Sequence, residues 1–169
     1  MNFEFNDTYK CYEGILTLPC DKNLFLQDTI DVKVFFDSEK ERNIKKESVL
    51  ADNIKNNFIH MYNEILEGIF RWRSKYNTEF EARDENGHYH FVNIEKKEDL
   101  HKYITPIDAI QLFFYKDNIY VSFSFYSGCI ISEDGISAIF LNNKLVSLDA
   151  TDPETTFYNN IVYELEQDS

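Results

Sequence analysis

The chain has 169 residues, of which 43% are hydrophobic and 16% aromatic, and its formal net charge at pH 7 is −13. This length and composition suit one folded domain, because there is enough apolar surface to fill a core, so intrinsic disorder is not expected. The negative charge argues against direct binding to nucleic acids or to anionic membranes, since both attract lysine and arginine.

Three further features of the sequence indicate where the protein works. No run of about 18 apolar residues is present, so a membrane-spanning segment is not expected. Residues 1–9 combine acids with aromatics and lack the basic and apolar regions of a secretory signal. Cys11, Cys20 and Cys129 are odd in number and widely spaced, which is typical of reduced thiols. We therefore expect a cytoplasmic protein.

Residues 1–37 are expected to form an antiparallel sheet of three strands, over 3–5, 12–18 and 30–36. The third strand has the period of a half-buried strand. Its apolar positions Ile30, Val32, Val34 and Phe36 alternate with Asp31, Lys33 and Phe35. The charged segment 37–47 lacks a periodic apolar pattern and is interpreted as a loop.

A long amphipathic helix is predicted from Ser48 to Tyr76, because apolar residues recur there at every third or fourth position. These residues are Leu50, Ile54, Phe58, Met61, Ile65, Ile69, Trp72 and Tyr76. The Ser48 hydroxyl is expected to cap the first turn. Gly68 lies within the apolar stripe, where it costs about 1 kcal/mol relative to alanine. We attribute it to the close approach of a strand or another helix.

Residues 77–105 connect this helix to the C-terminal strands. Within residues 78–94, Asn86 and Gly87 are a strong two-residue turn signal, and apolar residues on both sides allow a β-hairpin. A long loop is the alternative, and the sequence leaves both open. Residues 96–103 are expected to form a short helix that Pro106 ends.

Residues 107–150 are expected to form a second antiparallel sheet, because the hydrophobic period returns to two. Its four strands are predicted over 107–114, 119–126, 135–141 and 145–149. The last hairpin turn contains Asn142 and Asn143, since asparagine tolerates positive φ. A helical turn or two is expected within 157–165.

The predicted fold class is therefore α+β, with two antiparallel meanders, or one bent sheet, packed around one long central helix. The chain is interpreted as a single domain over residues 1–169. Its parts are an N-terminal sheet (1–37), the long helix (48–76), a variable region (77–105), a C-terminal sheet (107–150) and an acidic tail (151–169).

Negative charge is concentrated in the C-terminal third of the sequence, where Lys144 is the only base after Asp117. The acids of this third are Asp117, Glu133, Asp134, Asp149, Asp152, Glu154, Glu164, Glu166 and Asp168. The tyrosines expected to be exposed among them are Tyr120, Tyr126, Tyr158 and Tyr163. An acidic surface with exposed tyrosines is typical of a protein-binding surface and favours a basic partner by electrostatic steering.

The sequence offers few candidates for catalytic chemistry. It has no Walker loop, glycine-rich dinucleotide turn, nucleophile elbow or H-E-x-x-H motif. His88 and His90 form an H-x-H pair that could place two metal ligands on one face of a strand. A third ligand would have to come from elsewhere, for instance His101, Glu85 or Cys11. Two surface histidines beside a turn are the alternative interpretation.

The run from Ile119 to Asp149 reads IYVSFSFYSGCIISEDGISAIFLNNKLVSLD. Preceded by a long amphipathic helix and a short helix, it resembles an uncharacterised family of bacterial cytosolic domains of unknown function. In that family the loop commonly reads tryptophan, acid, any residue, Glu, His, Gly. Glu133 and Gly135 match, Asp134 stands at the histidine position, and no tryptophan precedes them. Members are often thought to act as immunity proteins in toxin systems, and the resemblance implies this role here.

Three functional hypotheses follow. The leading one is a non-enzymatic protein without a metal or another cofactor, in which Glu133, Asp134, Asp152 and Glu154 face the basic surface of a toxin. The second is a metal-dependent enzyme that uses His88 and His90. The third is a structural or regulatory homo-oligomer, such as a homodimer, formed through the apolar face of the long helix or an open sheet edge.

Overall fold

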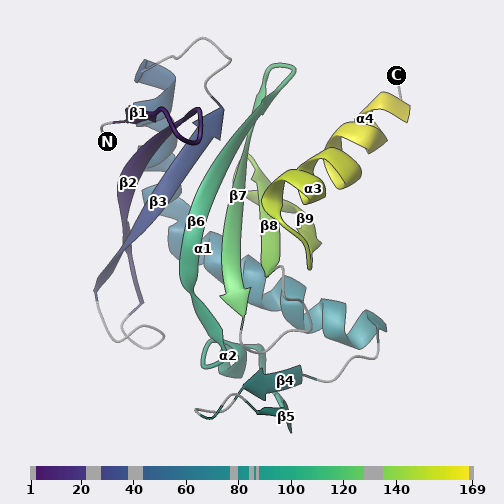
Figure 1. Cartoon of the computed structure of the whole chain (residues 1–169). Coiled ribbons are helices and arrows are strands. Elements are labelled where there is room, and N and C mark those ends of the chain that lie inside the picture. Colours follow the sequence, from purple (N-terminus) through teal and green to yellow (C-terminus); the bar gives the residue numbers. More distant parts are fainter. Residues whose placement is uncertain are drawn as a thin grey trace.

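The computed structural model describes residues 3–21, 28–37, 44–76, 80–83, 86, 88–127 and 135–167. The described chain contains a seven-stranded mixed sheet together with helices, which confirms the α+β class (Figure 1). In spatial order, the strands are β1 (Glu4–Asn6), β2 (Cys11–Pro19), β3 (Thr29–Asp37), β6 (Ile104–Tyr115), β7 (Asn118–Ser127), β8 (Ile136–Leu141) and β9 (Lys144–Asp149).

Both predicted meanders are present, and they join into one sheet. All neighbouring strands are antiparallel except β3 and β6, which pair in parallel through residues 33–36 and 109–112. A parallel pair requires a crossover connection. Here the crossover contains the long helix α1 (Ile44–Tyr76), which lies across one face of the sheet (Figure 1).

The predicted start of the long helix at Ser48 was wrong, because α1 begins at Ile44 and Ser48 lies inside it. The residues from Ile44 to Glu47 are mostly good helix formers, but only the segment after them carries the apolar stripe. That stripe packs into the main core. Its buried members are Ala51, Ile54, Phe58, Met61, Tyr62, Ile65, Leu66 and Ile69.

The close approach predicted at Gly68 is confirmed, and the neighbour is β9. A Cβ atom at Gly68 would lie 3.0 Å from Cδ2 of Leu145 and 3.3 Å from Cδ2 of Leu148. The missing side chain therefore lets α1 lie close to the edge strand of the sheet.

The region between α1 and β6 contains a hairpin, so the hairpin alternative for residues 78–94 is confirmed over its described part. Strands β4 (Phe80–Arg83) and β5 (Tyr89–Val92) are antiparallel and separate from the main sheet. The short helix α2 (Lys97–Leu100) follows. Pro106 does not end this helix as predicted, because β6 already begins at Ile104.

The acidic tail is helical over most of its length. Helix α3 (Pro153–Phe157), the π-helical turn η1 (Tyr158–Val162) and α4 (Tyr163–Gln167) follow one another without a break. They lie on the face of the sheet opposite α1 (Figure 1). We call residues 153–167 the acidic helix and the sheet face beneath it the outer face.

The acidic helix explains where the predicted surface tyrosines lie. Tyr158 and Tyr163 are 53% and 62% exposed, as predicted. The prediction was wrong for Tyr120, which is 3% exposed because Phe157 and Ile161 of the acidic helix pack over it. The side chain of Tyr126 lies outside the described residues.

Substitution of Gly68 tests the contact between α1 and β9. We expect Gly68→Val to lower the free energy of unfolding by about 1–3 kcal/mol, because its methyl groups would overlap with Leu145 and Leu148. Urea denaturation measures this change. Gly68→Ala is the control, since alanine favours the helix and its single Cβ meets only leucine methyl groups that can shift. Equal stability of the valine and alanine variants would contradict the close packing.

Candidate functional site

The four residues predicted to face a partner have different positions in the structure. Glu133 and Asp134 lie outside the described residues. Asp152 and Glu154 are both exposed at the start of the acidic helix. The structure therefore brings together the two C-terminal members of the predicted set.

Asp152 is the N-cap of α3. Its Oδ1 accepts a hydrogen bond of 2.9 Å from the backbone N–H of Thr155. Hydrogen bonds from the Thr155 hydroxyl and then from the Thr155 N–H hold the pKa of Asp152 below its usual value. Asp152 thus has a structural role that its position in the sequence, before Pro153, already indicates.

Aromatic and polar contacts fix the acidic helix on the sheet. The Phe157 ring stacks on Phe113 with a centroid distance of 4.3 Å and an interplanar angle of 5°. The Asn160 amide donates to Oδ2 of Asp149 over 3.1 Å. The hydroxyls of Thr151 and Thr156 lie 2.6 Å apart, and Thr156 is buried. The helix is therefore held at both its apolar side and its N-terminal end.

The solvent side of the acidic helix carries negative charge and tyrosine rings. Glu154, Glu164 and Glu166 are exposed there, together with Tyr158 and Tyr163. The sequence contains no lysine or arginine after Lys144, so no base within this segment neutralises them. The surface combines features that protein-binding sites use, which are rigid aromatic area and a single sign of charge.

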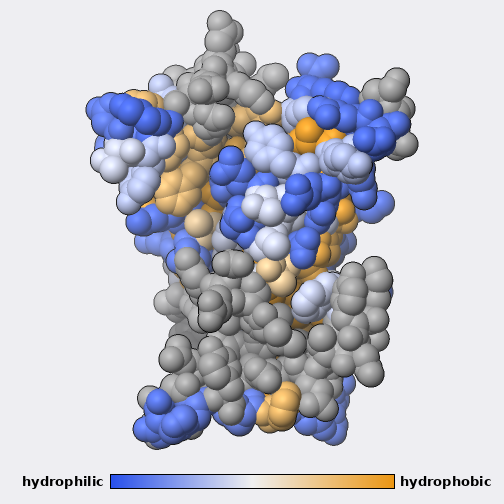
Figure 2. All heavy atoms as spheres, turned by 45° about the vertical axis from the view of Figure 1, so that its right-hand side comes forward, coloured by the Kyte–Doolittle hydropathy of each residue, from blue (hydrophilic) through white to orange (hydrophobic). Residues whose placement is uncertain are grey.

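A cleft of about 640 Å³ opens beside the acidic helix. Its walls are the acidic helix and the turn between β1 and β2, and its floor is the outer face of β3 and β6. Its aromatic side chains are Tyr9, Phe35, Phe113, Phe157 and Tyr158, whereas the rings of the bordering Phe36 and Phe114 pack in the main core on the other face of the sheet. Figure 2 shows hydrophobic surface on this side of the molecule between polar groups at the upper left and the acidic helix at the upper right.

Charged groups of both signs line the cleft. Glu13 and Glu154 stand on opposite walls, and Lys10 and Lys33 are the basic residues. Lys10 Nζ lies 3.4 Å from Oδ1 of Asp7, which offsets its charge. The cleft is therefore an amphipathic groove with aromatic walls, a form that suits an apolar group carrying a positive charge.

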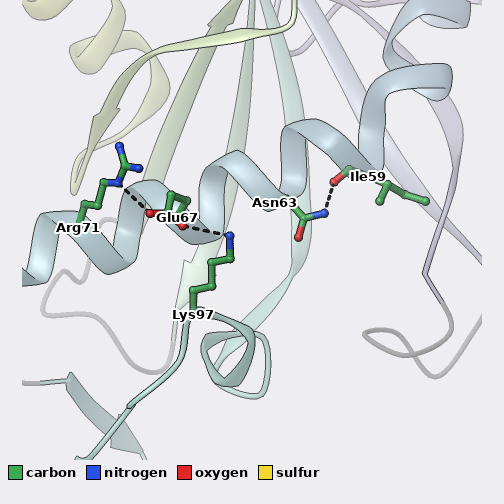
Figure 3. A network of polar contacts seen from close by, with 5 residues as sticks. All are labelled: Ile59, Asn63, Glu67, Arg71 and Lys97. Atoms are coloured by element: carbon green, nitrogen blue, oxygen red, sulfur yellow. Dashed lines mark hydrogen bonds and ion pairs between the residues drawn. The ribbon is translucent and has the colours of Figure 1, made fainter.

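A second hollow of about 490 Å³ lies along α1 and is occupied by an ion-pair network (Figure 3). Glu67 Oε1 lies 2.8 Å from Nε of Arg71, and its Oε2 lies 3.0 Å from Nζ of Lys97. Hydrogen bonds from Lys97 and then from Arg71 hold the pKa of Glu67 below its usual value. Because Lys97 belongs to α2, the network ties α2 to α1, and we assign it a structural role.

The four histidines do not gather at one place in the structure. His88 and His90 are exposed on the β4–β5 hairpin, His60 lies 3.6 Å from Glu64 on α1, and His101 follows α2. Within residues 3–167, apart from the segments that the structure does not describe, no three His, Cys, Asp or Glu side chains form a metal-binding group. Cys129 lies outside the described residues.

Tyr62 and His101 form a polar pair beneath α2. The Tyr62 hydroxyl and Nδ1 of His101 are 2.6 Å apart. Burial, and then the nearby Cys20, raise the pKa of Tyr62, and burial lowers the pKa of His101. Both groups are therefore kept neutral in the folded protein.

The aromatic cleft was not predicted from the sequence as a site. The available signal was Phe35, an aromatic residue at an outward position of the third strand.

A comparison of the chain with models of protein families, with curated proteins and with solved structures gives no significant match. None of the helices in the described part of the chain has the length and apolar character required to span a membrane.

Removal of the Asp152 cap should destabilise the acidic helix. We expect Asp152→Ala to lower the free energy of unfolding by about 1 kcal/mol, because the Thr155 N–H loses its acceptor. Chemical denaturation measures the change. Asp152→Asn removes the same charge but keeps an accepting oxygen, so it should remain close to the wild type. A loss of equal size in both variants would indicate that charge, and not capping, is responsible.

The Tyr62–His101 pair predicts a pH dependence of stability. The folded protein holds His101 neutral, whereas the unfolded chain binds a proton as the pH falls below about 6.5. Stability should therefore decrease from about pH 8 to about pH 5, and His101→Gln should remove part of this decrease. The control is His88→Gln, at an exposed site. Identical pH profiles of His101→Gln and the wild type would refute the assignment.

Proposed function

We propose that this chain is a non-enzymatic protein-binding module that neutralises a bacterial toxin by covering a basic surface of it. The observation that carries the proposal is the acidic helix. Its apolar side is fixed on the sheet through Phe157 and Ile161, and its solvent side presents three exposed glutamates beside two exposed tyrosines. The resemblance of the C-terminal half to suspected immunity proteins supports the same reading.

The charge of the chain indicates which kind of partner it binds. A net charge of −13 and the absence of bases after Lys144 would speed the encounter with a basic protein. The same charge opposes a homodimer through this surface, because two acidic helices would face each other. Exposed tyrosines would supply apolar contact area at a low cost in side-chain entropy.

The proposal predicts that neutralising the acidic helix weakens partner binding. The triple variant Glu154→Gln, Glu164→Gln and Glu166→Gln should raise the Kd for the captured basic partner by about tenfold or more, and it should reduce the salt dependence of binding. The control is Asp52→Asn, Glu95→Gln and Glu98→Gln, which removes the same charge from exposed positions outside the acidic helix.

The experiment should measure both binding of the partner and protection of cell growth from it. The wild-type chain is used to capture proteins from its source strain, and the partner is then expressed with and without the chain. We expect a basic protein whose expression stops growth, with growth restored by the wild type and by the control but not by the triple variant. A partner that is acidic, or one that does not impair growth, would refute the proposal.

A further inference from the structure

The described helices cover only half of the outer face of the sheet. The acidic helix packs on β7, β8 and β9, and its Phe157 also reaches Phe113 of β6. Among the described elements, no helix lies over the outer face of β2 and β3 (Figure 1). The opposite face, by contrast, is crossed by α1 from β2 to β9. Within the part of the chain that the structure describes, one half of the outer face is therefore an unpartnered surface.

Apolar groups gather on this open half. Ile15 of β2 is 54% exposed, Phe35 of β3 is half-buried in the floor of the cleft, and Tyr9 at the rim is 74% exposed. A third hollow, of about 430 Å³, adjoins the cleft, and the cleft and this hollow share Glu13 and Lys33. Together they form one groove from the acidic helix to the edge of the sheet, which we call the outer groove.

Carboxylates flank the outer groove on both sides. Glu4 and Glu13 are direct partners in the antiparallel ladder of β1 and β2, and like charges in this position destabilise a sheet. Glu154 stands on the opposite wall. Lys33 lies on the floor of both hollows, which it shares with Glu13. Because Lys10 is paired with Asp7, the three carboxylates face only Lys33 as an uncompensated base among the charged residues that line the groove. The groove therefore has a net negative charge and is complementary to positive charge.

The width of the open half fits one helix. Neighbouring strands are about 4.8 Å apart, so the strip from β2 to β6 is about 10 Å wide, which is close to the diameter of an α-helix. Helices also pack side by side at about 8–10 Å. A helix in the outer groove would lie next to the acidic helix and complete a second layer on this face.

We propose that the outer groove binds an amphipathic basic helix of the partner protein. Its apolar stripe covers Ile15 and Phe35, and its lysine or arginine side chains approach the Glu4–Glu13 pair on one side and Glu154 on the other. This inference rests on the proposed function and assigns the part of the surface that makes the apolar contact.

The test is a selection from displayed peptides of about 18 residues, or roughly five helical turns, with randomised apolar and charged positions. Enriched peptides should be helical, basic and amphipathic, and a proline in the middle of each should abolish binding. The variant Glu13→Gln with Ile15→Ser should weaken their binding by about tenfold or more. The matched control, Glu98→Gln with Val146→Ser, removes one exposed acid and one exposed apolar side chain elsewhere and should leave binding unchanged.

Four outcomes would overturn the inference. They are the absence of enrichment over an empty support, enrichment of acidic or proline-tolerant peptides, equal binding to the groove variant and the wild type, and a dimer in light scattering that the groove variant abolishes. The growth-protection experiment tests the proposed function independently of the groove. A wild-type chain that protects, together with a groove variant that protects equally and binds the toxin equally, would remove the groove and leave the acidic helix as the binding surface.

Discussion

The parallel ladder between β3 and β6 holds the two halves of this protein in one sheet. Every other strand pair in the main sheet is antiparallel and joins strands that follow one another in sequence. The ladder requires a crossover, and α1 supplies it while its apolar stripe buries the inner face of both halves. Phe35 belongs to β3 and Phe113 to β6, so this strand pairing also forms the floor of the cleft.

Local periodicity and turn chemistry were sufficient to predict most elements of the fold. Alternating apolar residues gave the strands of both meanders, and the period of the long helix gave its buried face. Asn142 and Asn143 adopt φ values of 51° and 64°, as the predicted hairpin turn requires. Gly68 was informative because a glycine in an apolar helical stripe has a cost that only a close neighbour can justify.

The remaining features depend on contacts between distant residues, which periodicity does not encode. The pairing of β3 with β6 joins segments more than one long helix apart, so no local pattern predicts it. The burial of Tyr120 follows from the docking of Phe157, and the strand pattern alone gave no reason to expect a helix there. The predicted acids Asp152 and Glu154 do lie together, but the aromatic cleft beside them arises from four separate parts of the chain.

The π-helical turn η1 determines how the side chains at the C-terminal end of the acidic helix are oriented. A π-helical turn holds one more residue than an α-helical turn, so the side chains after it are rotated by about 100° relative to an uninterrupted α-helix. Within α4 all side chains are exposed, whereas Phe157 and Ile161 before it are buried. One additional residue in η1 thus sets the direction in which Tyr163, Glu164 and Glu166 point around the helix axis. Deletion of one asparagine from η1 would turn these side chains to another side of the helix, although the acids and tyrosines of this end would be unchanged.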